Sequence, residues 1–195
     1  MRLAYAPFPP PMGEVYTFAD LERLPVDGRR YELIDGSIIV SPAPVTWHQV
    51  VARRIRDAIA QRMRPEAGLH AELGVGLHVG DDEVVPDVTV AAQAPFDARA
   101  PWLDPVDIVA VVEVESRFNR RVDRTVKPEI YASAGITTYL RVEMDDEGHL
   151  TLVTHELRDG RYAETGRVTG SGAAYLAALG VRLTPAEIEA GEIEP

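Results

Sequence analysis

Short apolar runs bounded by turn residues recur along the chain and predict β-strands. The clearest pair, residues 30–34 and 37–41, flanks Asp35-Gly36, the dipeptide that a two-residue type I′ hairpin prefers. The run at 107–116 is the richest in β-branched residues and predicts a central strand. Further strands are predicted at residues 69–79 with a bulge or bend at the glycines, 84–91, 137–144, 150–157 and 161–168.

Helical spacing appears between the strands. After Thr46, a possible N-cap, Val51, Ile55 and Ile59 recur at one-turn intervals and predict a helix over residues 46–64. Shorter helices are predicted at 17–24, 122–134 and 184–195. Gly135 would end the second of these, and the last would have a frayed end. A turn is expected at 81–83 and a loop at 95–105. This order predicts a mixed α/β or α+β fold, with a central mixed sheet flanked by helices.

Length and composition narrow the class of protein. The chain has 195 residues, 46% of them hydrophobic and 26% charged, which fits an extended lead-in at 1–16 and one globular domain at 17–195. It contains no cysteine, which excludes disulfides, thiolate metal sites and thiol nucleophiles and fits a reducing interior. Neither a signal peptide nor an apolar stretch of about 18 residues is present, so we expect a soluble, cytoplasmic protein without a membrane partner.

The net charge of −11 requires any surface that binds nucleic acid to be a local one. One candidate lies just before Lys127, where Asp123 is the single acid among four arginines: Arg117, Arg120, Arg121 and Arg124. A second basic run, at residues 53–64, is interpreted as the solvated face of the predicted helix.

Acidic residues interrupt two otherwise apolar strands. Asp87 follows Val84-Val85-Pro86, while Glu113 and Glu115 lie in the β-branched run and share one face of it. A buried carboxylate is costly unless it is paired or binds a cation, and oxygen ligands suit a hard divalent ion such as Mg²⁺. The alternative is that these acids lie at strand ends and face water, and spacing alone leaves both interpretations open.

Several segments in order resemble one known group of enzymes. They are the hairpin Tyr31–Gly36, His48, Pro86-Asp87-Val88, Val112-Glu113-Val114, and the set Asp123, Lys127, Tyr131 and Ala134-Gly135. Their order and spacing resemble the PD-(D/E)xK nuclease superfamily and, within it, the bacterial "putative restriction endonuclease" family.

This resemblance implies a restriction-endonuclease-like fold and a site centred on Mg²⁺ or Mn²⁺. Asp87 and Glu113 would be metal ligands and catalytic acids, with Glu32 as a supporting acid. The superfamily often has a lysine two residues after the second acid; here Glu115 stands there, as a further metal ligand or as a structural departure. The lysine would instead be Lys127 on the next helix.

Lys127 is also singled out by composition, because it is the only lysine in a chain that otherwise uses arginine. An ammonium group is compact and can orient a water molecule in a way that the planar guanidinium cannot. Pro128 follows it directly, so either the helix begins near Lys127 or it is bent there. His48 is a candidate substrate contact, with a capping or packing role as the alternative.

These features predict a metal-dependent endonuclease that hydrolyses DNA with a metal-activated water as nucleophile. We also expect a homodimer, because nucleases of this fold often pair their sites and because the segments from Arg161 onward and at 173–179 look too apolar for a free surface. The first alternative function is a catalytically drifted module that binds nucleic acid or protein. The second is a metal-dependent hydrolase of a small phosphorylated substrate.

Overall fold

A six-stranded mixed sheet forms the centre of the computed structural model, which describes residues 15–41, 45–100, 102–115 and 122–193. The strand order is β10-β9-β8-β7-β6-β3, and β7 and β8 run parallel while the other neighbours are antiparallel. These strands are β3 (Leu69–Leu73), β6 (Val88–Ala92), β7 (Ile108–Val114), β8 (Thr138–Met144), β9 (Leu150–Arg158) and β10 (Arg161–Thr169). The predicted fold class, a central mixed sheet flanked by helices, is confirmed.

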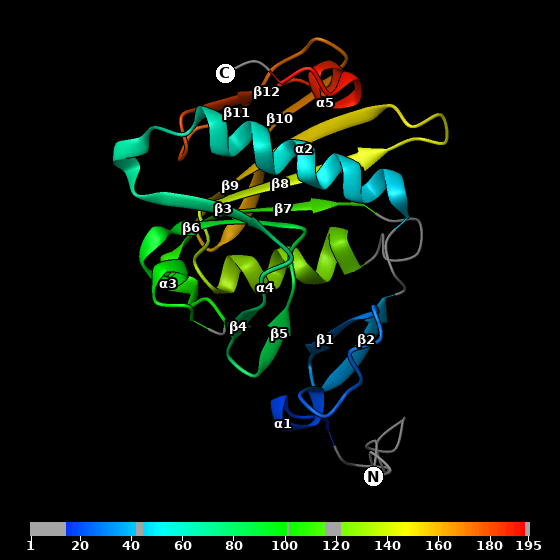
Figure 1. Ribbon diagram of the computed structural model, residues 1–195, viewed down its shortest axis with the longest axis vertical. Helices are drawn as coiled ribbons and strands as arrows, with labels where there is room; N and C mark the ends of the chain where they lie inside the picture. The colour runs from blue at the N-terminus through cyan, green and yellow to red at the C-terminus, as the bar shows by residue number, and fades with distance from the viewer. Residues whose placement is uncertain (1–14, 42–44, 101, 116–121, 194–195) are drawn as a thin grey trace.

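Helices cover both faces of this sheet. The long helix α2 (Thr46–Arg62) crosses one face and α4 (Lys127–Ser133) lies against the other (Figure 1). Alternation along β7 explains the two layers: Val112 and Val114 belong to the apolar core under α2, whereas Val111 belongs to the core that includes Tyr131 of α4. The helix predicted at 46–64 therefore packs as expected and ends two residues earlier.

A smaller four-stranded sheet, of order β2-β1-β5-β4, carries the N-terminal hairpin. Its strands are β1 (Arg30–Ile34), β2 (Ser37–Ser41), β4 (Leu77–Val79) and β5 (Asp82–Val84). The predicted hairpin is present, and Asp35 and Gly36 have φ angles of 48° and 65°, as a type I′ turn requires. The short helix α1 (Phe18–Leu21) packs on this hairpin through Leu21, beside Leu33 and Ile38.

Two strands predicted as continuous are each divided between the sheets. The segment 69–79 forms β3 in the large sheet and β4 in the small one, with Gly74 (φ 60°) between them. The segment 84–91 is divided because β5 ends at Val84 and β6 begins at Val88, with Pro86 between them; proline has no N–H for a strand ladder. Asp87 therefore lies where the chain passes from the small sheet into the large one.

The helix predicted at 122–134 has two parts. A π-helical turn, η3 (Val122–Val126), leads into α4, which begins at Lys127 with Pro128 in its first turn. Proline is well tolerated there, so the first of the two alternatives for Pro128 holds. The missing N–H of Pro128 removes one regular hydrogen bond to the preceding turn, which is where the wider π-helical turn lies.

Other departures from the predicted elements are local. The expected turn at 81–83 is shorter, because β5 begins at Asp82, and the expected loop at 95–105 overlaps a short helix. The remaining elements are η1 (Pro65–Ala67), α3 (Gln93–Asp97), η2 (Pro105–Asp107), the unpredicted hairpin of β11 (Ala174–Leu176) and β12 (Val181–Leu183), and α5 (Pro185–Ala190).

The C-terminal hairpin changes the argument for a homodimer. Its apolar side chains are buried in the chain's own core beside α2: Ala174, Leu176, Leu179, Val181 and Leu183. They therefore need no partner protomer to cover them, and the homodimer stays a prediction without that support. Within the part of the chain that the structure describes, no helix has the length and apolar character of a membrane span.

Candidate active site

Asp87 and Glu113 lie opposite each other on neighbouring strands. The antiparallel register pairs Val88 with Val112, so its continuation by one residue places Asp87 across from Glu113. The Val114 N–H donates a hydrogen bond of 2.9 Å to Asp87 Oδ2. Asp87 is 4% exposed and Glu113 is 2% exposed, so these acids do not simply face water at strand ends.

Two side chains with nitrogen donors hold the Asp87 carboxylate. Arg30 of β1 donates to Oδ1 at 2.8 Å, and His48 Nε2 of α2 lies 3.2 Å from Oδ2. Burial by itself would raise the pKa of Asp87, but the hydrogen bond and charge of His48 and the charge of Arg30 lower this pKa well below its usual range. Asp87 therefore remains ionised inside the protein.

Lys127 is buried between two of the predicted acids. Its Nζ lies 2.9 Å from Glu32 Oε1 and 3.0 Å from Glu113 Oε1, and Lys127 itself is only 3% exposed. Glu32 also accepts the Val85 N–H at 2.8 Å, and Glu113 accepts the hydroxyl of Tyr131 at 2.5 Å. The structure thus brings the four predicted catalytic residues, Asp87, Glu113, Glu32 and Lys127, to one place between the two sheets.

Negative charge exceeds positive charge around Lys127. Asp123 is also buried, with Oδ1 4.0 Å from Lys127 Nζ. Burial, together with the neighbouring acids, raises the pKa of Glu113 to about 8 and that of Asp123 to about 6. For Lys127, burial opposes the charge, but Glu113, Glu32 and Asp123 raise its pKa and keep it charged. The cluster therefore holds protons near neutral pH because its acids outnumber the nearby cations.

Glu115 does not join this cluster. Arg124 contacts both of its carboxylate oxygens, at 2.5 and 2.8 Å, and Arg141 Nε lies 3.3 Å from Oε1. Of the two possibilities for this position, the contacts favour the structural departure, because two arginines compensate the buried charge.

The predicted substrate-binding arginines are only partly described. Arg117, Arg120 and Arg121 lie outside the described residues. Arg124 is bound to Glu115 and also lies 3.5 Å from Glu143. Among the residues that the structure places, this basic run therefore offers no uncommitted guanidinium.

His48 lies in the first turn of α2, but it is not a cap of that helix. Its Nε2 lies 2.7 Å from the Val114 carbonyl oxygen as well as 3.2 Å from Asp87. Both partners are acceptors, so Nε2 carries the proton. Burial by itself would lower the pKa of His48. The hydrogen bond to Asp87 and the charge of Asp87 outweigh burial, so the pKa of His48 is raised.

Sequence reasoning assigned no role to Arg30 and Tyr131, which orient Asp87 and Glu113. A signal for Arg30 was present, because it is two residues from Glu32 and so shares its face of β1. The second basic run is only in part the predicted solvated face: Arg53 and Arg64 are exposed, but two other arginines bind the C-terminal segment. Arg54 donates to the carbonyls of Ile188 and Glu189, and Arg62 pairs with Glu187, so both hold α5 against α2.

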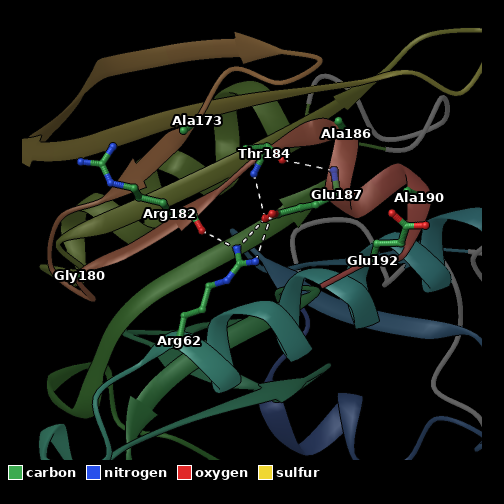
Figure 2. A pocket seen from close by; sticks show the side chains of 9 residues that line it. All are labelled: Arg62, Ala173, Gly180, Arg182, Thr184, Ala186, Glu187, Ala190 and Glu192. Carbon is green, nitrogen blue, oxygen red and sulfur yellow. Dashed lines mark hydrogen bonds and ion pairs between the residues drawn. The ribbon is translucent and has the colours of Figure 1, made fainter. Parts of the chain in front are cut away.

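Two pockets differ in what they offer to a ligand. The larger, about 870 Å³, lies at the C-terminal end beside α5, and Arg62 in its wall is engaged by Glu187 and the Arg182 carbonyl (Figure 2). The smaller, about 380 Å³, is lined by Asp87, Arg30 and His48. Of the predicted acids, Asp87 lines the smaller pocket.

The donor chemistry of Asp87, Glu113 and Glu32 fits a hard divalent cation, because all three are buried carboxylates in a region where negative charge is in excess, although their oxygens do not all lie within 4.8 Å of one another. In the absence of a cation, Arg30, His48 and Lys127 compensate these acids. Within the described ranges, one group of three potential ligands has atoms all within 4.8 Å: Asp145, Glu147 and His149. These residues are exposed in the β8–β9 turn, where Asp145 accepts the N–H groups of Glu147 and His149.

Comparison with known proteins agrees with the fold. The Uma2 family model, described as "Putative restriction endonuclease", matches residues 18–186. A crystal structure from Anabaena variabilis ATCC 29413, described as a putative nuclease, superposes with a TM-score of 0.73 at 17% identity, covering 89% of this chain and 97% of that one. No curated protein matches the chain. The match over residues 18–186 shows that the chain belongs to the Uma2 family of the PD-(D/E)xK type.

Proposed function

We propose that this protein is a Mg²⁺- or Mn²⁺-dependent endonuclease that hydrolyses phosphodiester bonds in DNA. The observation that carries the proposal is the burial of Asp87, Glu113, Glu32 and Lys127 at one point where the two sheets meet. Burying so many ionisable groups together costs folding free energy, and groups with perturbed pKa values beside a pocket are typical of active sites. Location in the cytoplasm and pairing as a homodimer belong to the same proposal.

Asp87 and Glu113 would hold the cation, with Glu32 as the supporting acid. A bound divalent ion supplies two things at such a site: activation of a water molecule and neutralisation of charge on the phosphoryl group. Arg30 and His48 fix the direction of the Asp87 carboxylate, and Tyr131 fixes that of Glu113. Lys127 is held between Glu32 and Glu113, from where its ammonium group can donate a hydrogen bond to a water molecule or a phosphate oxygen.

The proposal is tested by incubating supercoiled plasmid with the protein in Mg²⁺, in Mn²⁺ and in EDTA. We expect nicked or linear DNA with either metal and none in EDTA. Asp87→Asn and Glu113→Gln should each lower the rate at least a hundredfold. Glu66→Gln removes one exposed carboxylate far from the cluster in sequence and should cleave like the parent.

Folded parent protein that leaves the plasmid intact under every metal condition would contradict the proposal. That result would favour the catalytically drifted binding module, for which the replacement of the motif lysine by Glu115, held by two arginines, is the supporting observation.

A further inference from the structure

The 380 Å³ pocket beside Asp87 carries polar groups that the proposed cation site does not use. Arg30 and Asp87 form its inner wall, and His48, Gln49 and Arg53 of α2 line the side next to them. Gln49 and Arg53 are one helical turn apart and therefore point the same way. Arg53 has not been assigned a role so far.

His48 presents a buried polar atom to this pocket. The residue is 6% exposed, its Nε2 is bound to Val114 and Asp87, and its Nδ1 has no hydrogen-bond partner among the residues that the structure describes. A buried polar atom without a partner is costly and uncommon. Because Nε2 carries the proton, Nδ1 is a hydrogen-bond acceptor, and it is left available to a donor group such as a water molecule.

Arg53 differs from its neighbours on α2. Arg54 and Arg62 bind groups of the C-terminal segment, and Arg56 pairs with Asp57 at 2.9 Å. Arg53 is exposed and has no ion-pair or hydrogen-bond partner in the described ranges of the chain. A protein with a net charge of −11 thus keeps an uncommitted guanidinium at the rim of the pocket next to its buried acids.

The charges of the lining favour an anion. Arg30 and Arg53 carry two positive charges in this lining, against the one negative charge of Asp87. Guanidinium groups match the oxygens of a phosphate with paired hydrogen bonds, and the pocket is large enough to receive a nucleotide unit. Asp87 is shared between this pocket and the cation site, so a group bound here lies next to the reacting one.

We propose that this pocket binds a backbone phosphate of the DNA strand next to the phosphate that is cleaved. Arg53 and Gln49 contact it from α2, where both side chains line the pocket. The inference rests on the proposed function for its choice of substrate. In this arrangement α2 holds the DNA strand in register with the acids.

Binding without cleavage tests the pocket. A fluorescein-labelled 20-base-pair DNA duplex is titrated with the full chain in EDTA, and fluorescence anisotropy is measured from 25 to 200 mM salt. Arg53→Ala should weaken binding at least fivefold and lower the slope of log K against log salt by about 0.9, the value for one lost phosphate contact. Arg64 is an exposed arginine two residues beyond the C-terminal end of α2, so Arg64→Ala changes the net charge equally and should leave both quantities as in the parent.

Equal effects of the two substitutions, or a duplex that does not bind the parent protein, would overturn this inference. The outcomes also separate the two proposals. Binding that depends on Arg53 in a protein that never cleaves DNA keeps the pocket and removes the nuclease. Cleavage that depends on metal, with Arg53→Ala and Arg64→Ala indistinguishable in binding, keeps the nuclease and removes the pocket.

Discussion

Lys127 combines two roles that are usually separate in a protein. It pairs with Glu32 and Glu113 inside the fold, and it is the proposed donor to the substrate. Removing one partner of a buried ion pair costs about 3–5 kcal/mol, because the other charge stays behind without compensation. Structural and catalytic effects of Lys127 therefore have to be separated by the choice of substitution.

Lys127→Arg keeps the charge, so its effect on activity can be compared with that of Lys127→Met, which removes it. We expect Lys127→Arg to lower the cleavage rate at least a hundredfold. The planar guanidinium group of arginine is bulkier than an ammonium group, so its donors would be displaced, and a displacement of about 1 Å in an active site costs on the order of a hundredfold in rate. Urea unfolding should show a loss of about 1–3 kcal/mol for Lys127→Arg from overpacking and a larger loss for Lys127→Met. Near-parental cleavage by Lys127→Arg would show that only the charge matters.

The acid cluster gives the metal-free protein an unusual dependence on pH. The pKa of Glu113 is about 8 and that of Asp123 about 6 in the folded protein, both above their usual values because of burial. Their contribution to stability is complete below pH 4 and is lost as pH rises through these folded pKa values. The raised pKa of His48 acts in the same direction above pH 6.5.

In EDTA, the free energy of unfolding should therefore fall between pH 5 and pH 8. The scale of this fall is about 1.4 kcal/mol for each unit by which the pKa of a group in the folded protein exceeds that in the unfolded protein. Urea unfolding at intervals of half a pH unit measures it. Glu113→Gln should flatten the curve, whereas Glu66→Gln, which changes an exposed acid, should not. A parent curve that rises steadily over this range would contradict the account of the cluster.

The central acids were predictable because a carboxylate inside an apolar strand stands out from its immediate neighbours. Glu115 stands out equally, and sequence alone left its role open because its partners Arg124 and Arg141 come from later elements. Arg30 contacts Asp87 from 57 residues away. Local patterns therefore identified the acids, whereas the counter-charges depended on long-range packing.

At the scale of elements, short-range signals set the hairpins and helices. The β1–β2 hairpin and α2 follow from turn chemistry and helical spacing, and both were predicted. The division of 69–79 and 84–91 between two sheets was not predicted, because it depends on which strands become neighbours in space. The β11–β12 hairpin was missed because its alternation extends over only three residues in each strand.

Gly36 in the β1–β2 turn should tolerate no side chain. It has a φ of 65°, and an added Cβ would lie 2.6 Å from the Cβ of Val15. A residue with a Cβ pays roughly 1–2 kcal/mol for the left-handed backbone conformation. We expect Gly36→Ala to lower the free energy of unfolding by more than this, because of the added contact with Val15. Gly80→Ala is the matched control, because Gly80 has a φ of 63° and no heavy atom lies within 4 Å of the added Cβ. Equal losses in urea unfolding would contradict a role for the Val15 contact.

At the scale of the whole molecule, a bound cation should stabilise the fold. Ions that bind the native state raise its stability by mass action, about 2.7 kcal/mol at a hundred times the dissociation constant. Mg²⁺ should therefore raise the melting temperature of the parent at pH 7.5, and much less that of Asp87→Asn or Glu113→Gln. A rise of the same size in the Asp87→Asn protein would contradict its assignment as a ligand.

The homodimer is also decided at this scale. Nucleases of this fold often pair their sites. If this protein does so, light scattering at tens of micromolar should give twice the mass of the 21.4 kDa chain. A monomer mass would remove the prediction, which no longer has the C-terminal apolar segments as support.

The position of the acids at the meeting of two sheets has a consequence for how activity arises during synthesis and folding. Glu32 and Arg30 belong to the small sheet, Glu113 to the large one, and Lys127 to a helix from the second half of the chain. Contacts between such distant segments form late, after local hairpins and helices. A nascent or partly unfolded chain therefore lacks the assembled cluster, so the proposed nuclease activity should appear only with the completed fold.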